Sequence, residues 1–162
     1  MSDAAIRAFH PEDLPELCEI AVRAWEPVFG DWRDLMGDEM FYAGWPDWRA
    51  DKAGQIVDFC QRTPEWCLVA ELEGRVVGFI TYTLSRETAI AEIGNNAVDP
   101  EYQGRGIGTE QYRYVLEVFR EEGMKFAKVS TGLDPAHAPA RRAYEKAGFA
   151  QFIPMVYYYQ EL

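Results

Sequence analysis

The chain has 162 residues, of which 48% are hydrophobic and 14% aromatic, and this composition excludes a disordered or low-complexity protein. A chain of this length is expected to form a single domain over residues 1–162. Its 16 basic and 27 acidic residues give a net charge of −11, which argues against nucleic acid or an anionic membrane as a partner. There is no apolar run of membrane-spanning length and no basic segment followed by an apolar one at the start, so we expect a cytoplasmic protein.

The three cysteines, Cys18, Cys60 and Cys67, are odd in number and form no CxxC pair. They predict neither a disulfide framework nor a zinc site, and buried, unreactive thiols are the favoured interpretation. We therefore expect no metal.

The first half of the chain predicts one short strand and then helices. Apolar residues recur there at helical spacing, prolines and acidic residues occupy an expected first turn, and a glycine or a Thr-Pro pair marks the expected ends. The expected elements are a strand at residues 6–9, a helix from residue 10 to Gly30, an irregular aromatic segment at residues 31–48 and a helix at residues 47–62.

After residue 63 the pattern changes to the period of strands. The Glu73-Gly74 pair between two apolar runs predicts a hairpin turn. Gly94, Asn95 and Asn96, inside the next strand, predict a β-bulge or a splayed edge. The expected elements are strands at residues 66–72, 76–84 and 88–98, a helix at 107–122, a strand at 125–131, a helix at 139–147 and an extended segment, or a strand, at 149–160.

This order of elements predicts an α/β fold in which helices flank one mixed central sheet. The strands at residues 66–98 follow one another closely enough to be antiparallel neighbours, so the sheet is expected to be mostly antiparallel.

The segment from Glu92 to Gly108 joins an apolar strand to a helix through a glycine-rich turn. Gly104, Gly106 and Gly108 permit close backbone approach, and the first amide groups of the following helix lack internal partners. Such a turn favours phosphate binding, which the helix dipole assists. The spacing matches neither a P-loop nor the GxGxxG fingerprint, so on the glycines alone a plain strand-to-helix connection is the alternative.

The order Q-x-x-G-x-G at Gln103, Gly106 and Gly108, preceded by AVDPEY, resembles the acetyl-CoA-binding signature of the GNAT superfamily of N-acetyltransferases. IRAFHPEDLPEL is similar to the family's opening strand and helix, the hairpin at residues 66–84 to its central strands, and HAPARRAYEKAGF to its last shared segment. The resemblance covers essentially the whole chain in order. It implies an acetyltransferase whose sheet is splayed where acetyl-CoA binds.

The resemblance implies that acetyl-CoA is the co-substrate and indicates which groups hold it. Backbone groups of Ala97 and Val98 would pair with the pantetheine arm as an added strand. The irregularity at Asn95 and Asn96 would separate this strand from the next and leave an amide near Asn96 or Ala97 for the thioester carbonyl. The residues expected at the pyrophosphate, where Arg105 would add charge, are Gln103, Gly104, Arg105, Gly106, Ile107, Gly108 and Thr109.

Acyl transfer to an amine needs a neutral amine and a proton donor for the leaving thiolate. Tyr144 matches the tyrosine that many relatives use as general acid, with a core tyrosine as the alternative. Glu92, eleven positions before Gln103, matches the glutamate base of histone-acetylating relatives; a surface carboxylate is the alternative, and relatives also use a water chain as base. Where many relatives have an asparagine, this chain has His137, which we expect to contact the cofactor or cap its helix rather than act as the base.

The absence of a GxSxG motif favours direct attack by the amine in a ternary complex. Trp25, Phe29 and Trp32, with acidic residues nearby, predict an aromatic mouth for a small cationic amine, and packing of these rings onto the sheet is the alternative. A protein lysine or N-terminus is the competing acceptor, and the acyl group, acetyl or larger, stays open.

Two alternatives of another class are an acyl-CoA-binding sensor without catalysis and nucleotide-phosphate binding by the glycine turn. The C-terminal sequence MVYYYQEL is expected either to pair across a homodimer interface or to cover the sheet edge.

Overall fold

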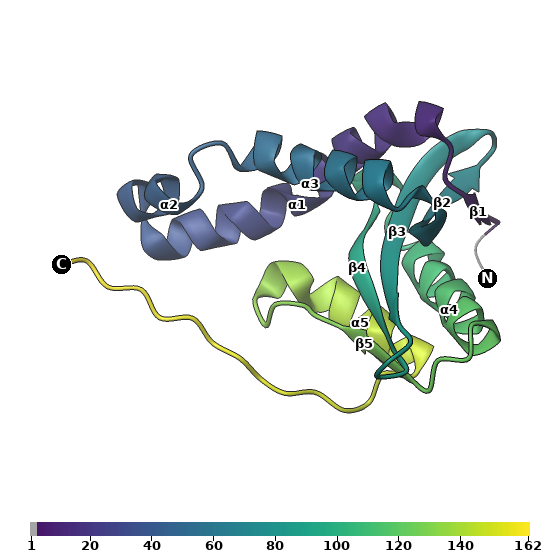
Figure 1. Ribbon diagram of the computed structural model, residues 1–162. Helices are drawn as coiled ribbons and strands as arrows, with labels where there is room; N and C mark the ends of the chain where they lie inside the picture. Colours follow the sequence, from purple (N-terminus) through teal and green to yellow (C-terminus); the bar gives the residue numbers. More distant parts are fainter. Residues whose placement is uncertain (1–2) are drawn as a thin grey trace.

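The computed structural model describes residues 3–162 and contains a five-stranded sheet with helices on both faces (Figure 1). The strands lie in the order β1-β2-β3-β4-β5; the first four pair antiparallel, and β5 pairs parallel to β4. The predicted mixed, mostly antiparallel sheet is therefore confirmed. The strands are β1 (Ala5–Ala8), β2 (Cys67–Leu72), β3 (Arg75–Ser85), β4 (Ile90–Val98) and β5 (Phe126–Val129), and the helices are α1 (Leu14–Met36), α2 (Asp38–Gly44), α3 (Trp48–Arg62), α4 (Ile107–Glu121) and α5 (Ala138–Ala147).

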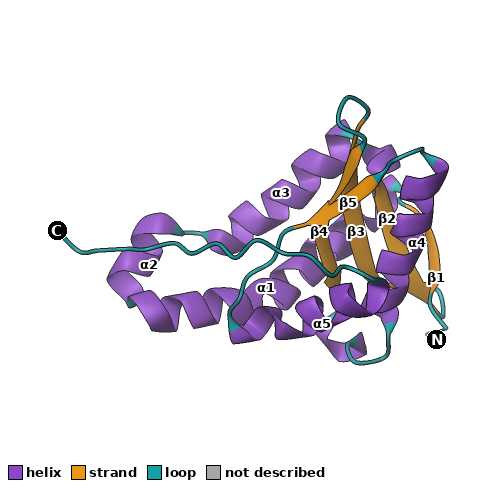
Figure 2. Cartoon of the chain, turned by 90° about the horizontal axis from the view of Figure 1, so that it is seen from below, coloured by secondary structure: helices purple, strands orange, loops and turns teal. Residues whose placement is uncertain are grey.

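Two helix layers enclose the sheet (Figures 1 and 2). Successive strand residues point to opposite faces, so Phe79 packs with Leu17 and Ile56 in the core beneath α1 and α3. Its neighbour Ile80 packs with Val115 and Tyr144 in the core beneath α4 and α5. The sheet is thus buried on both sides, and a ligand reaches its centre only where two strands part.

The hairpin between β2 and β3 confirms the predicted turn. Glu73 and Gly74 have φ values of +51° and +77°, and Leu72 pairs with Arg75 across the turn. Two successive positive φ values match the twist of a two-residue hairpin.

The expected end of the first helix at Gly30 is wrong. Helix α1 continues to Met36 and ends at Gly37, whose φ is +79°. Gly30 stays helical, because a glycine ends a helix only where the backbone turns left-handed. The aromatic segment beyond it, expected to be irregular, completes α1 and forms α2, and Phe29 stacks on Trp48 with ring centroids 4.4 Å apart. This packing ties the end of α1 to α3.

The strand alternative for residues 149–160 is also wrong. The segment is extended and exposed, but it pairs with no strand of its own chain. Phe149 is the last residue packed on the body, where its ring lies 5.9 Å from that of Tyr144. The outer edge of β5 therefore stays open in this chain.

The predicted irregularity in β4 is confirmed as a β-bulge. Ile80 pairs with Asn96, whereas Tyr82 pairs with Ile93, so two residues of β4 lie opposite Thr81. Pairing between β4 and β5 ends at Ile93 and Val129. Beyond the bulge the two strands part, which splays the sheet.

Two hydrogen bonds hold the bulge from the side of α1 and α3. The Thr81 hydroxyl donates to the Asn95 carbonyl at 3.0 Å, and a Cβ on Gly94 would come within 2.8 Å of that hydroxyl. Lys52 Nζ donates to Asn95 Oδ1 at 2.6 Å and lies 3.6 Å from the ring centre of Trp25. The bulge is thus fixed by a buried cation.

Lys52 is only 6% exposed, and burial lowers its pKa from 10.5 to about 8. Its hydrogen-bond partners, Asn95 and Gln55, are uncharged. Because the folded-state pKa lies below the ordinary value, the penalty of burying the ammonium is fully present below pH 8 and is relieved as the pH rises towards 10.5.

We predict that Lys52→Met abolishes the gain in stability of about 2 kcal/mol that the wild type shows between pH 7 and pH 9.5. At pH 7 the free energy of unfolding should change by less than this, because removing the buried ammonium also leaves Asn95 Oδ1 without its hydrogen bond. Denaturant titrations at pH 7 and pH 9.5 measure both effects. The exposed Lys125→Met serves as the control and should change stability by less than about 0.5 kcal/mol; equal effects of the two substitutions would contradict the prediction.

Candidate active site

A cleft of about 560 Å³ opens where β4 and β5 part. The bulge and end of β4, the glycine turn, the start of α4, the residues after β5 and one side of α5 form its walls, and Trp25 of α1 borders it. The residues predicted for the cofactor that line it are Ala97, Val98, Gln103, Gly104, Gly106, Ile107, Gly108, Thr109 and His137. Segments far apart in the sequence thus meet at one cavity.

The glycine turn presents backbone amides to this cleft. Gly104 and Gly106 have φ values of +77° and +84°, a conformation that side chains disfavour. Gly106 begins α4 without a side-chain cap, and its carbonyl accepts only from Glu110 N at 3.1 Å. The amides of the first turn therefore lack intrahelical partners, as an anion site requires.

An ion pair between a half-exposed arginine and a buried aspartate anchors the turn to α1. Asp99, 6% exposed, accepts from Arg23 at 2.7 Å and from the amide of Glu101 at 3.1 Å. The carboxylate thus caps the short turn after β4 and fixes its approach to the cleft.

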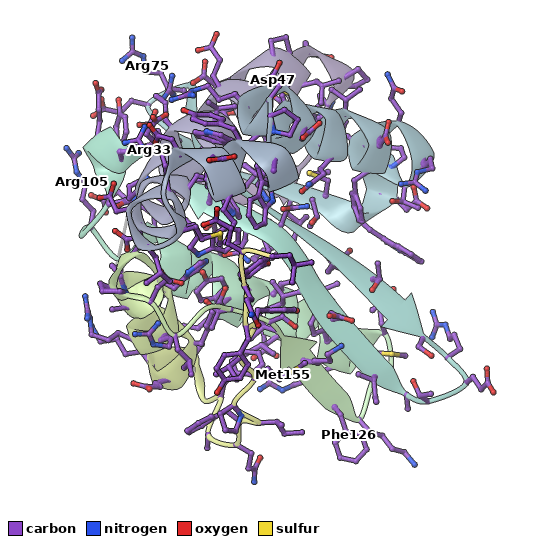
Figure 3. The ribbon with its side chains drawn as sticks, turned by 90° about the vertical axis from the view of Figure 1, so that its left-hand side faces the viewer. Arg33, Asp47, Arg75, Arg105, Phe126 and Met155 are labelled. Carbon is purple, nitrogen blue, oxygen red and sulfur yellow. The ribbon has the colours of Figure 1, made fainter. Side chains whose placement is uncertain are left out.

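Arg105 lies outside the cleft lining. Its side chain is exposed and points away from the body (Figure 3), with its guanidinium 5.0 Å from the ring centre of Tyr102. It contributes charge near the turn and lies over the ring of Tyr102, which lines the cleft.

Tyr144 reaches the bulge from α5. Asn96 Nδ2 donates to its hydroxyl at 3.3 Å, and the Tyr112 hydroxyl donates to Asn96 Oδ1 at 2.7 Å. The two tyrosine rings lie 4.6 Å apart. Asn96 is therefore held between two phenols on the face opposite to Lys52.

Burial raises the pKa of both phenols. For Tyr144 this effect outweighs the hydrogen bonds from Asn96 and Tyr112, which lower its pKa. For Tyr112 burial dominates, and the neighbouring Tyr144 raises its pKa further. Both hydroxyls are protonated at neutral pH, so Tyr144 carries a proton that it can donate in the cleft.

His137 is held by a carboxylate that the sequence did not indicate. Its Nδ1 lies 2.6 Å from Asp134 Oδ2, and its amide donates to Asp134 Oδ1 at 3.1 Å. Burial alone would raise the pKa of Asp134, but the hydrogen bonds from His137 lower it. A Cβ on Gly132 would overlap this pair, since it would lie 2.6 Å from His137 Nδ1. The imidazole does not cap α5; its orientation comes from Asp134.

Glu92 lies at the edge of the site and not on the cleft wall. Its carboxylate forms an ion pair with Lys128 of β5 at 3.0 Å and is 40% exposed. Its neighbours Ala91 and Ile93 pack in the core that contains Tyr144, so Glu92 points to the opposite face of the sheet.

The predicted acceptor aromatics divide between two places. Trp25 lines the cleft. Phe29 and Trp32, with ring centroids 5.2 Å apart, belong to the aromatic cluster at the end of α1, and Phe29 borders a separate groove of about 580 Å³ beside Trp45 and Trp48. Only Trp25 of the three meets the cofactor cleft.

Sequence reasoning missed Tyr112, Lys52 and Asp134. Tyr112 could have been found, because it lies four residues after Gly108 and three before Val115, on the stripe that α4 buries. Lys52 acts through side chains that are distant in the sequence, and no local pattern marks it. Asp134 could have been found, because an aspartate before a proline is typical of a residue that caps a helical turn.

Within residues 3–162, no cluster of three or more His, Cys, Asp or Glu side chains is arranged to hold a metal. Every helix of the described chain is too short or too polar to serve as a membrane span. The cysteines are free thiols, with Cys60 and Cys67 buried and Cys18 half-buried.

Comparison with known proteins shows which family the chain resembles. The Acetyltransferase (GNAT) family matches residues 14–149. A mycothiol acetyltransferase of Rhodococcus opacus is 28% identical over 147 residues, covering 87% of this chain and 43% of the relative. The chain spans 34% to 58% of the length of the curated relatives that it matches.

Solved structures share the fold. A GNAT acetyltransferase of Brucella melitensis in complex with acetyl-CoA has a TM-score of 0.62 at 24% identity, covering 93% of this chain and 85% of the other. An aminoglycoside acetyltransferase from an uncultured soil sample, in complex with sisomicin, has a TM-score of 0.59 at 20% identity, covering 98% and 96%. With most of its length matched and the splayed sheet and glycine turn in place, the chain belongs to the GNAT family of acetyltransferases.

Proposed function

We propose that the protein transfers an acetyl group from acetyl-CoA to a primary amine by direct attack, and that the acceptor is a small molecule. The observation that supports this most is the cleft at the splayed end of β4. It brings the free amides of α4 and the phenol of Tyr144 to one cavity.

The cofactor half of the proposal rests on the turn and on the end of β4. The amides from Gln103 to Thr109 fit a pyrophosphate, because the helix dipole and the positive-φ glycines both favour an anion there. Ala97 and Val98 lie beyond the last residue that pairs with β5. Their backbone groups on that side are available to a pantetheine arm.

Acetyl-CoA supplies the reactive thioester, and the chain supplies a proton donor. The leaving thiolate needs a proton, and Tyr144 is a protonated phenol on the cleft wall that Asn96 orients. A core tyrosine would also need a partner for its hydroxyl, and it is the position of Tyr144 on the cleft wall that favours a catalytic role. We therefore assign Tyr144 the role of general acid.

For the base we propose Glu92, acting through water from the edge of the site. Lys128 holds its carboxylate at 3.0 Å, and its partial exposure leaves room for solvent. His137 is the alternative, because it lines the cleft and Asp134 fixes its ring. A contact of His137 with the cofactor accounts equally for that position.

The acceptor half is shaped by Trp25. One face of its ring is occupied by the Lys52 ammonium, so a cationic acceptor meets the ring edge or the opposite face. A small amine suits this restricted wall better than a protein segment does, and a protein lysine or N-terminus is the competing acceptor. The net charge of −11 attracts cationic amines.

We predict that acetyl-CoA binds and that NAD and ATP fail to displace it. Calorimetric titration with competition measures this. Thiol release is then followed with a panel of polyamines, amino acids, aminoglycosides and peptides with a free N-terminus. Binding without thiol release for any amine would support the non-catalytic sensor, and displacement by NAD or ATP would support a nucleotide site.

We predict that Tyr144→Phe lowers kcat by about 100-fold or more, as expected for loss of a general acid. The affinity for acetyl-CoA should change by less than about threefold, since the phenyl ring keeps its packing. Tyr112→Phe is the matched control: it removes the other hydroxyl on Asn96 and should lower kcat by less than about tenfold. If the two variants lose activity equally, the role of Tyr144 is structural.

We predict that Glu92→Gln lowers kcat/KM about tenfold for alkylamines, whose nitrogen must lose a proton, and by less than about threefold for acceptors already neutral at the assay pH. His137→Asn should mainly change the KM for acetyl-CoA. Steady-state kinetics across acceptors of different pKa separates the two residues. A dependence on acceptor pKa in His137→Asn alone would transfer the role of base to His137.

A further inference from the structure

The side-chain amide of Asn95 has one end bound and the other end free. Its Oδ1 accepts from Lys52 Nζ at 2.6 Å, whereas no hydrogen bond within residues 3–162 uses its Nδ2. In that part of the chain, Gln111 Nε2 is the single buried side-chain nitrogen or oxygen without a partner, so Asn95 Nδ2 is not enclosed by protein. Because Asn95 lines the cofactor cleft, its free amide hydrogens open onto that cleft.

Lys52 determines which end of the Asn95 amide is free. An ammonium has donors and no acceptor, so it can hold Oδ1 but not Nδ2. The position of the ammonium is itself fixed, because Nζ lies 3.6 Å from the ring centre of Trp25 and the side chain is almost fully buried. The amide therefore cannot turn over without losing its bond to Lys52.

The charge behind this part of the wall favours an oxygen over a second cation. Lys52 contacts both Asn95 and Trp25, which line the cleft. Its hydrogen-bond partners are uncharged side chains, so no carboxylate among them neutralises the ammonium. At short range such a charge repels an ammonium and attracts an oxygen lone pair. The cationic nitrogen of an acceptor is thus directed away from Asn95, and an oxygen towards it.

We propose that Asn95 Nδ2 donates a hydrogen bond to an oxygen of the acceptor, and that Lys52 is the positioning residue that turns Nδ2 towards the cleft. This rests on the proposed acetyl transfer and narrows its acceptor to a primary amine with a hydroxyl or carboxylate near the nitrogen. The oxygen must be near, because the next residue, Asn96, contacts the proposed acid Tyr144 and consecutive Cα atoms are only about 3.8 Å apart. Alkyl polyamines, which contain no oxygen, are then poor acceptors.

Binding of matched amines tests the free donor. Butylamine and 2-methoxyethylamine have similar size, and the ether oxygen of the second accepts hydrogen bonds but donates none. Dissociation constants are measured by ligand-observed NMR at pH 7 on protein saturated with CoA, where both amines are protonated. The ether should bind about fivefold tighter than butylamine, as expected for one hydrogen bond. Ethanolamine against propylamine then tests a hydroxyl, and glycine a carboxylate. Equal binding of each oxygen-bearing ligand and its alkylamine would overturn the proposal.

Substitutions assign the preference to Asn95 and Lys52. Asn95→Asp removes the donor but keeps a bond from Lys52, and it should abolish the preference for the ether. Lys52→Met, which frees the amide to turn over, should lower the preference at least about twofold. Gln55→Met is the matched control, because Gln55 is the other hydrogen-bond partner of Lys52, at 3.4 Å, and it should leave the preference unchanged. A preference that survives Asn95→Asp would overturn the proposal.

Thiol release from acetyl-CoA with the same amines separates this proposal from the proposed function. If no amine releases thiol but the binding preference is present, acetyl transfer is refuted and the role of Asn95 stands. If thiol is released but oxygen-bearing and alkyl amines bind equally, acetyl transfer stands and the role of Asn95 is refuted. Should Asn95→Asp fail to fold, the preference of the wild type and its reduction in Lys52→Met decide the question.

Discussion

The bulge in β4 is the constraint on which the rest of the site depends. One extra residue opposite Thr81 sends Asn95 and Asn96 to opposite faces of the sheet. Lys52 holds the first from the α3 side, and Tyr112 holds the second from the α4 side. Both helix layers are needed, because without a hydrogen-bonding residue from either layer one of the two asparagine side chains would be left without its hydrogen bond. The bulge therefore links both layers to the line along which the sheet opens.

The polar groups on the two faces of the sheet at the bulge differ in their chemistry. On one face lies the buried Lys52 ammonium, which has no carboxylate among its hydrogen-bond partners. It packs against the ring of Trp25, which borders the proposed acceptor side. On the other lie two phenols whose pKa values burial raises. An arrangement of this sort stabilises developing negative charge and supplies protons, and it gives little help in removing one. The proposed base is accordingly Glu92, which lies outside the wall, or His137, which lies on the wall and is held by Asp134.

Local signals in the sequence predicted much of this arrangement. The Glu73-Gly74 turn, the irregular β4 and the glycine turn were predictable because each depends on the backbone conformation of a few adjacent residues. The predicted end of the first helix at Gly30 was wrong, since packing of the aromatic rings keeps the helix intact beyond that residue. Asp134 was missed although it lies only three residues before His137. Lys52 was missed because its contact with Asn95 arises only after distant segments meet. The course of residues 149–160 was likewise beyond local reasoning, because a strand is defined by its neighbour.

Because the pairing between β4 and β5 is short, the stability of the fold can depend on what binds beside it. Only four residue pairs join these strands, from Ile90 with Phe126 to Ile93 with Val129. A pantetheine arm that pairs with β4 beyond Ile93 would extend this pairing, and the added partner would be a diffusible molecule. The resistance of the fold to heat and proteolysis would then increase with the concentration of that molecule, as for any ligand that binds only the folded state. The amount of folded enzyme would thereby follow the supply of its own acyl donor.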